Sequence, residues 1–511
     1  MRPGGPAAPS VILSENGGLA VSASIDLSAV LGDIFIVDGR RVSVEGPTLT
    51  VTDPASGQVV GSIPAADGSA VDAAVQAAHR AFATWSRTTP AARSKYLLRL
   101  AAWAEEHVDL LARLTTLEQG KPLSEARSEV GQVVKSLRYY AAEAPRLLGE
   151  TIPTESETLR STAIRQPIGV AACIVGWNYP LGLMGWKIAP ALAAGCTVVA
   201  KPSSKTPFGT LALAAAAAEE CDFPRGVLNV VTGGGETTGE ALVTHPLVRK
   251  VSFTGGNEAG LQVLTWAAQG VKRVTLELGG HSPMLVAPDA PLQLAVRDGV
   301  KRAFRNAGQL CNSVNRIYVH RSIADEFTDE FVRAAAKLRL GAGLANPEPD
   351  MGPLTTREGL DRVALHVEDA RQRGGEVVLG GSPPADEELA SGLFFAPTVI
   401  TGATETMLVL NEETFGPVAP ISVVDDMDEA IERANGLEYG LVAYLYTTDL
   451  RFSTLASERL EFGTVNVNNV GGGDVGYPYA GWKRSGLGVE LSRHGMLEYL
   501  NVKHIRVEVG Y

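Results

Sequence analysis

Residues 170–200 read VAACIVGWNYPLGLMGWKIAPALAAGCTVVA, an almost wholly apolar run that is long enough to span a bilayer. Two polar side chains, Asn178 and Lys187, and two prolines, Pro180 and Pro190, interrupt this run. The pattern also changes within it, from a short strand-like segment to a helical one. These interruptions favour a buried strand–helix–strand unit over a membrane span.

The same alternation continues on the C-terminal side of this run. Short apolar strands that alternate with helices are typical of a mostly parallel sheet covered on both faces, so an α/β fold is predicted. The predicted strands are residues 170–175, 198–200, 227–231, 248–253 and 272–278, and the predicted helices between them are residues 181–194, 206–221, 236–244 and 258–268. Earlier helices are predicted at residues 69–85, with a capping-box-like start at Ser69, at 90–116 and at 128–147.

A second alternating series begins near Met284 and predicts a second α/β lobe. It comprises predicted helices at residues 292–304, 323–338 and 428–434, and predicted strands at residues 317–319, 376–379, 421–424 and 443–446. Residues 158–166 and 499–509 also have the pattern of strands but belong to neither series. Their unpaired edges would be a liability unless another strand covered them.

Composition limits the classes of partner and compartment. The chain has 511 residues, a net charge of −12 and a pI of about 5.3, which makes it a poor candidate for binding nucleic acid or anionic membranes. Its four cysteines show no CxxC pair, and this usage predicts a reducing, cytoplasmic location. The first ten residues are rich in Pro, Gly and Ala and lack the apolar core of a signal peptide, so a flexible tail is predicted up to about residue 33.

Two short motifs carry the residues suited to covalent chemistry. The sequence LELGG at residues 276–280 places Glu277 at the end of a predicted strand, directly before two glycines. The sequence FRNAGQLC at residues 304–311 places Cys311 after a glycine-containing loop. A cysteine presented on such a loop can attack a substrate carbon, and a glutamate can prepare the sulfur or a water molecule.

These motifs resemble those of the NAD(P)-dependent aldehyde dehydrogenase superfamily, of the non-acylating, hydrolytic type. Further motifs of that family follow in the family's order: GWNYP at residues 176–180, KPS at 201–203, FTGG at 253–256, EETFGP at 412–417 and KRSGLG at 483–488. The similarity extends from about Ile34 to the C-terminus. It implies oxidation of an aldehyde to a carboxylic acid through a cysteine thiohemiacetal and a thioester.

The resemblance assigns three catalytic residues and no metal ligand. Cys311 is the implied nucleophile, and Glu277 is the implied general base that activates water for release of the acid. Asn178, with the backbone N–H of Cys311, is the implied donor to the oxyanion. The other three cysteines are interpreted as buried structural residues.

The cofactor site is implied by the family motifs and not by the most obvious glycine-rich loop. GGGETTG at residues 233–239 follows a predicted strand, but its spacing is not that of the Rossmann fingerprint. The resemblance places the pyrophosphate of NAD or NADP at a later helix N-terminus. The implied cofactor-binding residues are Trp177, Lys201, Ser204, Gly255, Gly256, Glu413 and Phe415.

Ser204 predicts use of NADP. Many NAD-preferring relatives carry a glutamate at this position, which binds the adenine-ribose hydroxyls. A serine removes a carboxylate that would repel a 2′-phosphate, and Lys205 adds a positive charge nearby. Either NAD or NADP is therefore expected to serve.

The predicted substrate tunnel is mostly apolar or aromatic. It is expected to be lined by Tyr179, Leu183, Trp186, Leu310 and Tyr479, which suits an aliphatic or aryl aldehyde. The FRNAGQ sequence also resembles the succinate-semialdehyde branch, but that branch has an arginine where Trp186 stands here. An uncharged aldehyde is therefore favoured over one with a carboxylate at its far end.

The resemblance also implies the domain organisation and two alternatives. It implies a flexible extension at residues 1–33, a Rossmann-type cofactor-binding domain at 34–150 and 168–279, a catalytic domain at 280–480, and oligomerisation and C-terminal segments at 151–167 and 481–511. A homodimer or homotetramer is expected. There are two alternatives. One is a CoA-acylating dehydrogenase, against which the presence of Glu277 argues. The other is a catalytically silent binding or structural homologue, against which the presence of Cys311 argues.

Overall fold

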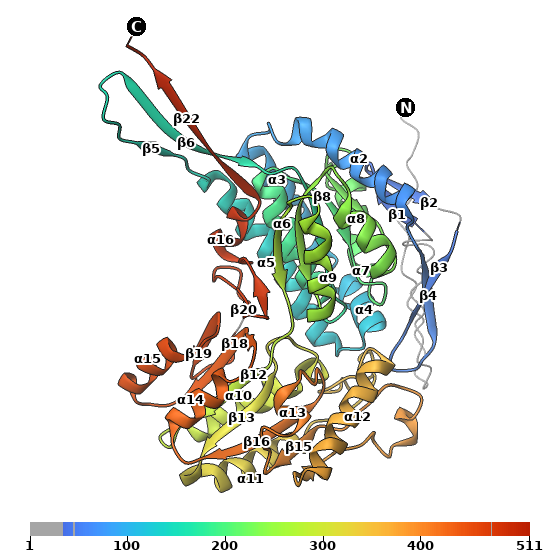
Figure 1. The fold of residues 1–511 in the computed structure, drawn as a ribbon. Helices are drawn as coiled ribbons and strands as arrows, with labels where there is room; N and C mark the ends of the chain where they lie inside the picture. Colours follow the sequence, from blue (N-terminus) through green and yellow to red (C-terminus); the bar gives the residue numbers. More distant parts are fainter. Residues whose placement is uncertain (1–33, 44–45, 472, 511) are drawn as a thin grey trace.

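The computed structural model describes residues 34–43, 46–471 and 473–510, so the extension predicted at residues 1–33 lies outside the described part. Two α/β lobes lie one above the other, and a narrow arm of strands projects from the first (Figure 1). Among the helices of the described residues, none has the length and apolar character that a membrane span requires.

The first lobe is built on an eight-stranded sheet whose five central strands are parallel. Its order is β2 (Arg40–Ser43), β1 (Ile34–Val37), β9 (Leu228–Val230), β8 (Thr197–Lys201), β7 (Val170–Ile174), β10 (Val248–Thr254), β11 (Arg273–Glu277) and β21 (Gly486–Leu487). The strand–helix–strand unit predicted at residues 170–200 is present as β7, α6 (Pro180–Ala194) and β8.

Helices cover both faces of this sheet, which explains why its central strands are continuously apolar. Successive residues of a strand point to opposite faces. Ala171 and Cys173 therefore pack with α3 (Pro90–Glu106), α5 (Leu123–Glu143), α6 and α7 (Phe208–Glu219). Val170 and Ala172 pack on the other face with α2 (Gly68–Trp85), α8 (Glu240–Thr244) and α9 (Asn257–Ala268).

The second lobe has a seven-stranded sheet, parallel except at β14. Its order is β14 (Glu376–Leu379), β15 (Thr398–Thr401), β16 (Val418–Val424), β13 (Val314–His320), β12 (Ser282–Val286), β18 (Val442–Tyr446) and β19 (Thr464–Val467). Its helices are α10 (Leu292–Phe304), α11 (Ala324–Ala335), α12 (Arg357–Gln372), α13 (Leu408–Asn411), α14 (Met427–Asn435) and α15 (Leu450–Arg459). The chain crosses from the first sheet to the second between β11 and β12, through Gly279 and Gly280.

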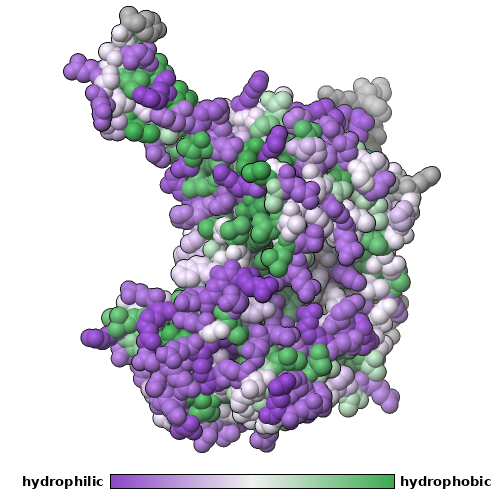
Figure 2. Space-filling model, in the orientation of Figure 1, coloured by the Kyte–Doolittle hydropathy of each residue, from purple (hydrophilic) through white to green (hydrophobic). Residues whose placement is uncertain are grey.

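The projecting arm is a three-stranded antiparallel sheet. β6 (Leu159–Pro167) pairs with β22 (Leu500–Glu508) over its whole length, and β5 (Glu150–Ile152) pairs with the other edge of β6. Val502 and Val507, five residues apart on β22 and therefore on opposite faces, are 65% and 48% exposed. Figure 2 shows apolar surface along this arm.

Three local predictions are wrong. The single helix predicted at residues 90–116 is two helices, because the chain bends at His107 (φ −104°, ψ 26°) between α3 and α4 (Val108–Gln119). The helix predicted from residue 236 begins as a π-helical turn, Gly235–Gly239, before α8. The N-cap of α2 is Asp67 and not Ser69, since the Asp67 carboxylate accepts the N–H of Ala70 at 2.9 Å.

Candidate active site

Cys311 follows a tightly turned loop at the end of α10. Asn306, Ala307 and Gly308 have φ of 50°, 53° and 72°, three consecutive left-handed residues that reverse the chain. Only glycine fits at position 308, because a Cβ there would lie 2.0 Å from the carbonyl oxygen of Gly416. This turn places Cys311 at the junction of the two lobes.

The thiol of Cys311 is half-buried, and its pKa lies above the usual range of a thiol. Burial raises its pKa to about 12, while a hydrogen bond with Tyr479 opposes that shift. The Sγ atom lies 3.5 Å from the hydroxyl oxygen of Tyr479. The thiol therefore requires a proton acceptor before it can act as a nucleophile.

Glu277 ends β11 with its carboxyl group almost fully buried. Within the described part of the chain, neither carboxyl oxygen has a hydrogen-bond partner. Burial raises the pKa of Glu277 well above its usual range, and the negative charge of Glu490 raises it further, while Lys187 lowers it. A buried carboxyl group without partners and with a raised pKa is the environment expected of a general base.

Lys187 and Glu490 form a buried ion pair that the sequence analysis did not assign to the site. Lys187 Nζ donates to Glu490 Oε1, and so does the hydroxyl of Ser252 at 2.9 Å. The signal in the sequence was Lys187 itself, a single lysine in the otherwise apolar α6, which had been interpreted only as evidence against a membrane span.

Asn178 lies in the turn between β7 and α6, against the nucleophile loop. Its Nδ2 donates one N–H to the carbonyl oxygen of Gln309 at 3.1 Å and carries a second N–H. The main-chain carbonyl of Asn178 accepts from Asn306 Nδ2 at 3.1 Å, so contacts run in both directions between the turn and the loop.

The start of α9 has the features of a phosphate site. Gly256 is the N-cap of this twelve-residue helix, and no side chain caps it. A Cβ at Gly256 would meet no atom of the described residues within 4 Å, so there is open space beside the start of the helix. Gly260 packs against Leu278, where a Cβ would lie 2.4 Å from Cδ2, and holds the helix close to β11. These residues fit the pyrophosphate of a dinucleotide.

Lys201, Ser204 and Lys205 surround the end of β8. Lys201 is buried, and burial lowers its pKa to about 8. Within the described part the side-chain ammonium of Lys201 donates to the carbonyl of Pro202 at 3.4 Å, so it has capacity for a further acceptor. Ser204 is half-buried and Lys205 is exposed.

Glu413 and Phe415 come from the second lobe and meet residues of the first. Glu413 Oε1 accepts the N–H of Gly280 at 3.0 Å, and burial raises the pKa of Glu413 to about 7. Phe415 has φ of 51° and packs edge-on against Trp177 at 5.4 Å between ring centroids. The fold thus brings together three motifs that lie at residues 176–180, 276–280 and 412–417 of the chain.

The predicted tunnel residues lie on α6, beside the nucleophile and on the C-terminal segment. Trp186 packs edge-on against Tyr479 at 5.5 Å between ring centroids, while Leu183 and Leu310 are buried. A Cβ at Gly473 would lie 2.7 Å from the Trp186 ring, so the indole occupies the space beside that glycine. Tyr479 was predicted as a wall, but its hydroxyl also reaches Cys311.

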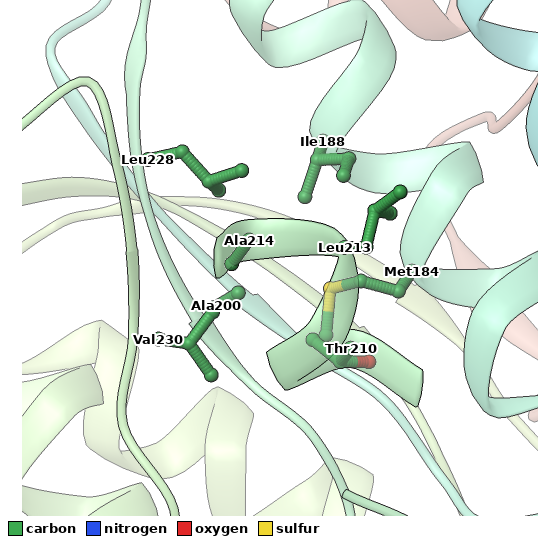
Figure 3. A pocket seen from close by; sticks show the side chains of 8 residues that line it. All are labelled: Met184, Ile188, Ala200, Thr210, Leu213, Ala214, Leu228 and Val230. Carbon is green, nitrogen blue, oxygen red and sulfur yellow. The ribbon is translucent and has the colours of Figure 1, made fainter. Parts of the chain in front are cut away.

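Two other observations concern a gap in the first lobe and the side chains that bind metals. An apolar gap between α6, α7 and the sheet, lined by Met184, Ile188, Leu213 and five other residues, leaves no room for a water molecule (Figure 3). No group of three or more His, Cys, Asp or Glu side chains in the described residues could hold a metal ion.

Residues 42–505 match the aldehyde dehydrogenase family, and the chain belongs to that family. It is 43% identical to the 3-sulfolactaldehyde dehydrogenase of Pseudomonas putida over 92% of this chain and 96% of that one. It is 42% identical to the NADP(+) succinate-semialdehyde dehydrogenase of Escherichia coli K12 over 90% and 94% of the two chains.

Solved structures agree with these sequence relatives. The fold is similar to an NADP-dependent enzyme of Escherichia coli, with a TM-score of 0.91, 40% identity and coverage of 94% of this chain and 99% of that one. It is similar to the betaine aldehyde dehydrogenase of Staphylococcus aureus in complex with NAD+, with a TM-score of 0.92, 34% identity and coverage of 96% and 97%. These comparisons confirm the predicted α/β fold and the predicted family. The protein is an NAD(P)-dependent enzyme that oxidises an aldehyde to a carboxylic acid. The CoA-acylating alternative is not favoured.

Proposed function

We propose that Cys311 is the nucleophile, Glu277 the general base and Asn178 the oxyanion donor of this aldehyde oxidation. The observation that supports this assignment is the buried carboxyl group of Glu277, which has no hydrogen-bond partner among the described residues and whose charge raises the pKa of the Cys311 thiol. Both groups lie where the two lobes meet, next to the residues that fit a dinucleotide. A carboxylate in that position can accept a proton from the thiol or from water.

The reaction would proceed in two stages at the sulfur atom of Cys311. The deprotonated sulfur adds to the aldehyde carbon, and the resulting oxyanion accepts hydrogen bonds from Asn178 Nδ2 and the backbone N–H of Cys311. When bound, the nicotinamide serves as the acceptor of the hydride from the same carbon, which becomes a thioester carbon. Glu277 then accepts a proton from water as the water oxygen adds to the thioester. The carbon–sulfur bond then breaks, which releases the acid and leaves Cys311 as a thiolate.

The chain's own residues would hold the cofactor along its whole length. The N–H groups at the start of α9, after Gly255 and Gly256, would bind the pyrophosphate. Lys201 and Ser204 would lie at the adenine-ribose end. Glu413 would accept hydrogen bonds from the nicotinamide-ribose hydroxyls, and Phe415 with Trp177 would pack near the nicotinamide. The absence of a carboxylate at Ser204 supports NADP use at least equal to NAD use.

We propose an uncharged aliphatic or aromatic aldehyde as the substrate class. Trp186 and Tyr479 present ring surfaces beside Cys311, and Leu183 and Leu310 complete an apolar wall. A second candidate is an aldehyde with an anionic group at its far end. Two relatives are named for substrates of this kind, the 3-sulfolactaldehyde dehydrogenase and the succinate-semialdehyde dehydrogenase. Arg305 favours this second candidate, because its guanidinium interacts with Tyr179, one of the proposed tunnel residues. However, Glu125 lies 3.5 Å from the same guanidinium and offsets its positive charge.

One kinetic panel tests both proposals. NAD(P)H absorbance is followed with hexanal, benzaldehyde and succinate semialdehyde, with and without CoA, and the product acid is quantified. We expect acid without CoA and a higher kcat/KM for the two uncharged aldehydes, because each buried methylene contributes about 0.8 kcal/mol in an apolar tunnel. A higher kcat/KM for succinate semialdehyde would instead support the anionic class.

We propose a homodimer or homotetramer in the cytoplasm. The arm of β5, β6 and β22 is exposed on both faces, and its apolar residues Val502 and Val507 would be covered by a partner subunit. All four cysteines are free thiols, which suits a reducing compartment. Light scattering of the wild type and of a variant that ends before Leu500 measures the contribution of the arm to assembly.

A further inference from the structure

A fully buried ion pair contacts the turn that carries Asn178. Lys121 Nζ donates to Glu129 Oε2 at 2.5 Å, and neither side chain has any exposed surface. Burial lowers the pKa of Lys121, and the neighbouring Glu129 opposes that shift. Removing two charges from water is costly, so a pair of this kind is weak evidence for stability by itself. The reaction described above uses neither residue.

Lys121 contacts two consecutive residues of the Asn178 turn. Besides its bond to Glu129, Nζ donates to the main-chain carbonyl oxygen of Asn178 at 2.8 Å. The same ammonium lies 3.6 Å from the ring centroid of Tyr179, a cation–π contact between two buried side chains. One charged group therefore fixes both the backbone at Asn178 and the aromatic ring that follows it.

Glu129 fixes the other end of the turn. Its Oε1 atom accepts the N–H groups of Leu181 and Gly182, at 2.8 and 3.0 Å, in the first turn of α6. The N-cap residue of α6, Tyr179, makes no capping bond with its own side chain. Glu129 thus replaces the missing cap, and its negative charge is favourable at the helix N-terminus.

We propose that the Lys121–Glu129 pair positions the side-chain amide of Asn178 for the oxyanion. The pair holds the turn at the Asn178 carbonyl, which also accepts from Asn306 Nδ2 of the nucleophile loop, and at the start of α6. The turn held in this way keeps the Asn178 amide against the nucleophile loop, where Nδ2 lies 3.1 Å from the Gln309 carbonyl. A donor to a developing oxyanion is effective only within a narrow range of positions, which gives a catalytic reason for a costly buried pair. This inference rests on the proposed role of Asn178, and both members of the pair are positioning residues.

The test is a double-mutant comparison in two backgrounds. Lys121→Met alone would leave a buried, unpaired carboxylate and would destabilise the fold. The paired substitution Lys121→Met with Glu129→Gln keeps similar volumes, and the Gln oxygen can still accept the N–H groups of Leu181 and Gly182. It is made in the wild type and in Asn178→Ala, and kcat and the KM for the cofactor are measured. Lys135→Met, at an exposed position of α5, is the matched control.

We expect the paired substitution to lower kcat by about tenfold to a hundredfold in the wild type, as for a displaced donor. In the Asn178→Ala background the same substitution should change kcat by less than about threefold, because there is no longer an amide to position. The KM for the cofactor and the control variant should match the wild type. If the paired variant does not fold, Lys121→Arg, which keeps both charges and changes only the donor geometry, is compared in the same two backgrounds, with the same dependence on Asn178 expected.

Two results would overturn the inference. An equal loss of kcat in both backgrounds would show a general structural role, and no loss in the wild type would show that the pair does not affect the reaction. Full activity of Asn178→Ala itself would have a different meaning, because it would remove the proposed oxyanion role and with it the basis of the inference.

Discussion

The main-chain carbonyl oxygen of Cys311 lies directly against Gly280, and a Cβ atom on that glycine would come within 2.1 Å of it. The N–H of Gly280 donates in the same place to Glu413 Oε1 at 3.0 Å. One glycine therefore separates the proposed nucleophile from the carboxylate assigned to the cofactor, with no space for a side chain. The crossing between the two lobes is also the scaffold of the site.

Gly280→Ala is expected to lower kcat/KM by about a hundredfold or more, because the nucleophile loop must move to admit the methyl group. Gly131→Ala is the matched control, since a Cβ at this position on α5 meets no atom within 4 Å. Thermal unfolding of both variants separates a displaced loop from a lost fold. Activity of a folded Gly280→Ala protein equal to the wild type would contradict the proposed site.

Cys311→Ala is expected to abolish aldehyde oxidation and leave cofactor affinity almost unchanged, because the thiol forms the covalent bond away from the adenosine end. Cys221→Ala, at a buried position outside the site, is the control. Stopped-flow NAD(P)H absorbance and fluorescence titration of the cofactor give the two readings. Steady turnover in Cys311→Ala at the wild-type rate would remove it as the nucleophile.

Glu277→Gln is expected to produce a burst of reduced cofactor followed by slow turnover. The amide cannot accept a proton from water, so the thioester accumulates after the first stage. The burst amplitude should approach one equivalent per active site, and mass spectrometry of the quenched protein should detect the acyl group on Cys311. Absence of both signals would place the role of Glu277 before thioester formation.

Ser204→Glu is expected to shift preference from NADP towards NAD, mainly through the KM for NADP. A carboxylate at this position would repel a 2′-phosphate that carries close to two negative charges. The ratio of kcat/KM values for the two cofactors is measured in both proteins at one ionic strength, because screening changes such contacts.

Glu413→Gln is expected to change the pH dependence of stability in the protein without cofactor. The pKa of Glu413 is raised from 4.5 to about 7 in the folded protein. Between these two values the folded protein therefore binds more protons than the unfolded chain. The contribution of Glu413 to stability is consequently lost as the pH rises through 7. The neutral amide does not titrate. Its melting temperature relative to the wild type should therefore rise between pH 5 and pH 8, by an amount equivalent to at most about 3 kcal/mol. A constant difference across this range would show that Glu413 does not titrate there.

The sequence alone determined the α/β architecture and the chemical parts of the site. Continuous apolar strands such as residues 170–174 require cover on both faces, and this local property predicts a layered parallel sheet without knowledge of any contact. The motifs around Glu277 and Cys311 indicated the family, since each motif is a short contiguous segment. Prediction was less accurate at His107, where one backbone conformation ends a helix although the apolar pattern continues.

Only the tertiary structure decided how these parts act on one another. Lys187 and Glu490 are far apart in the chain, and no local pattern relates this pair to Glu277. Lys121 and Glu129 are close in the chain but fully buried, and no local pattern relates this pair to Asn178. The pKa values of Cys311, Glu277 and Glu413 are likewise set mainly by burial, which depends on the packing of both lobes. Residue types are local properties of a sequence, whereas desolvation and charge proximity arise only when distant segments meet.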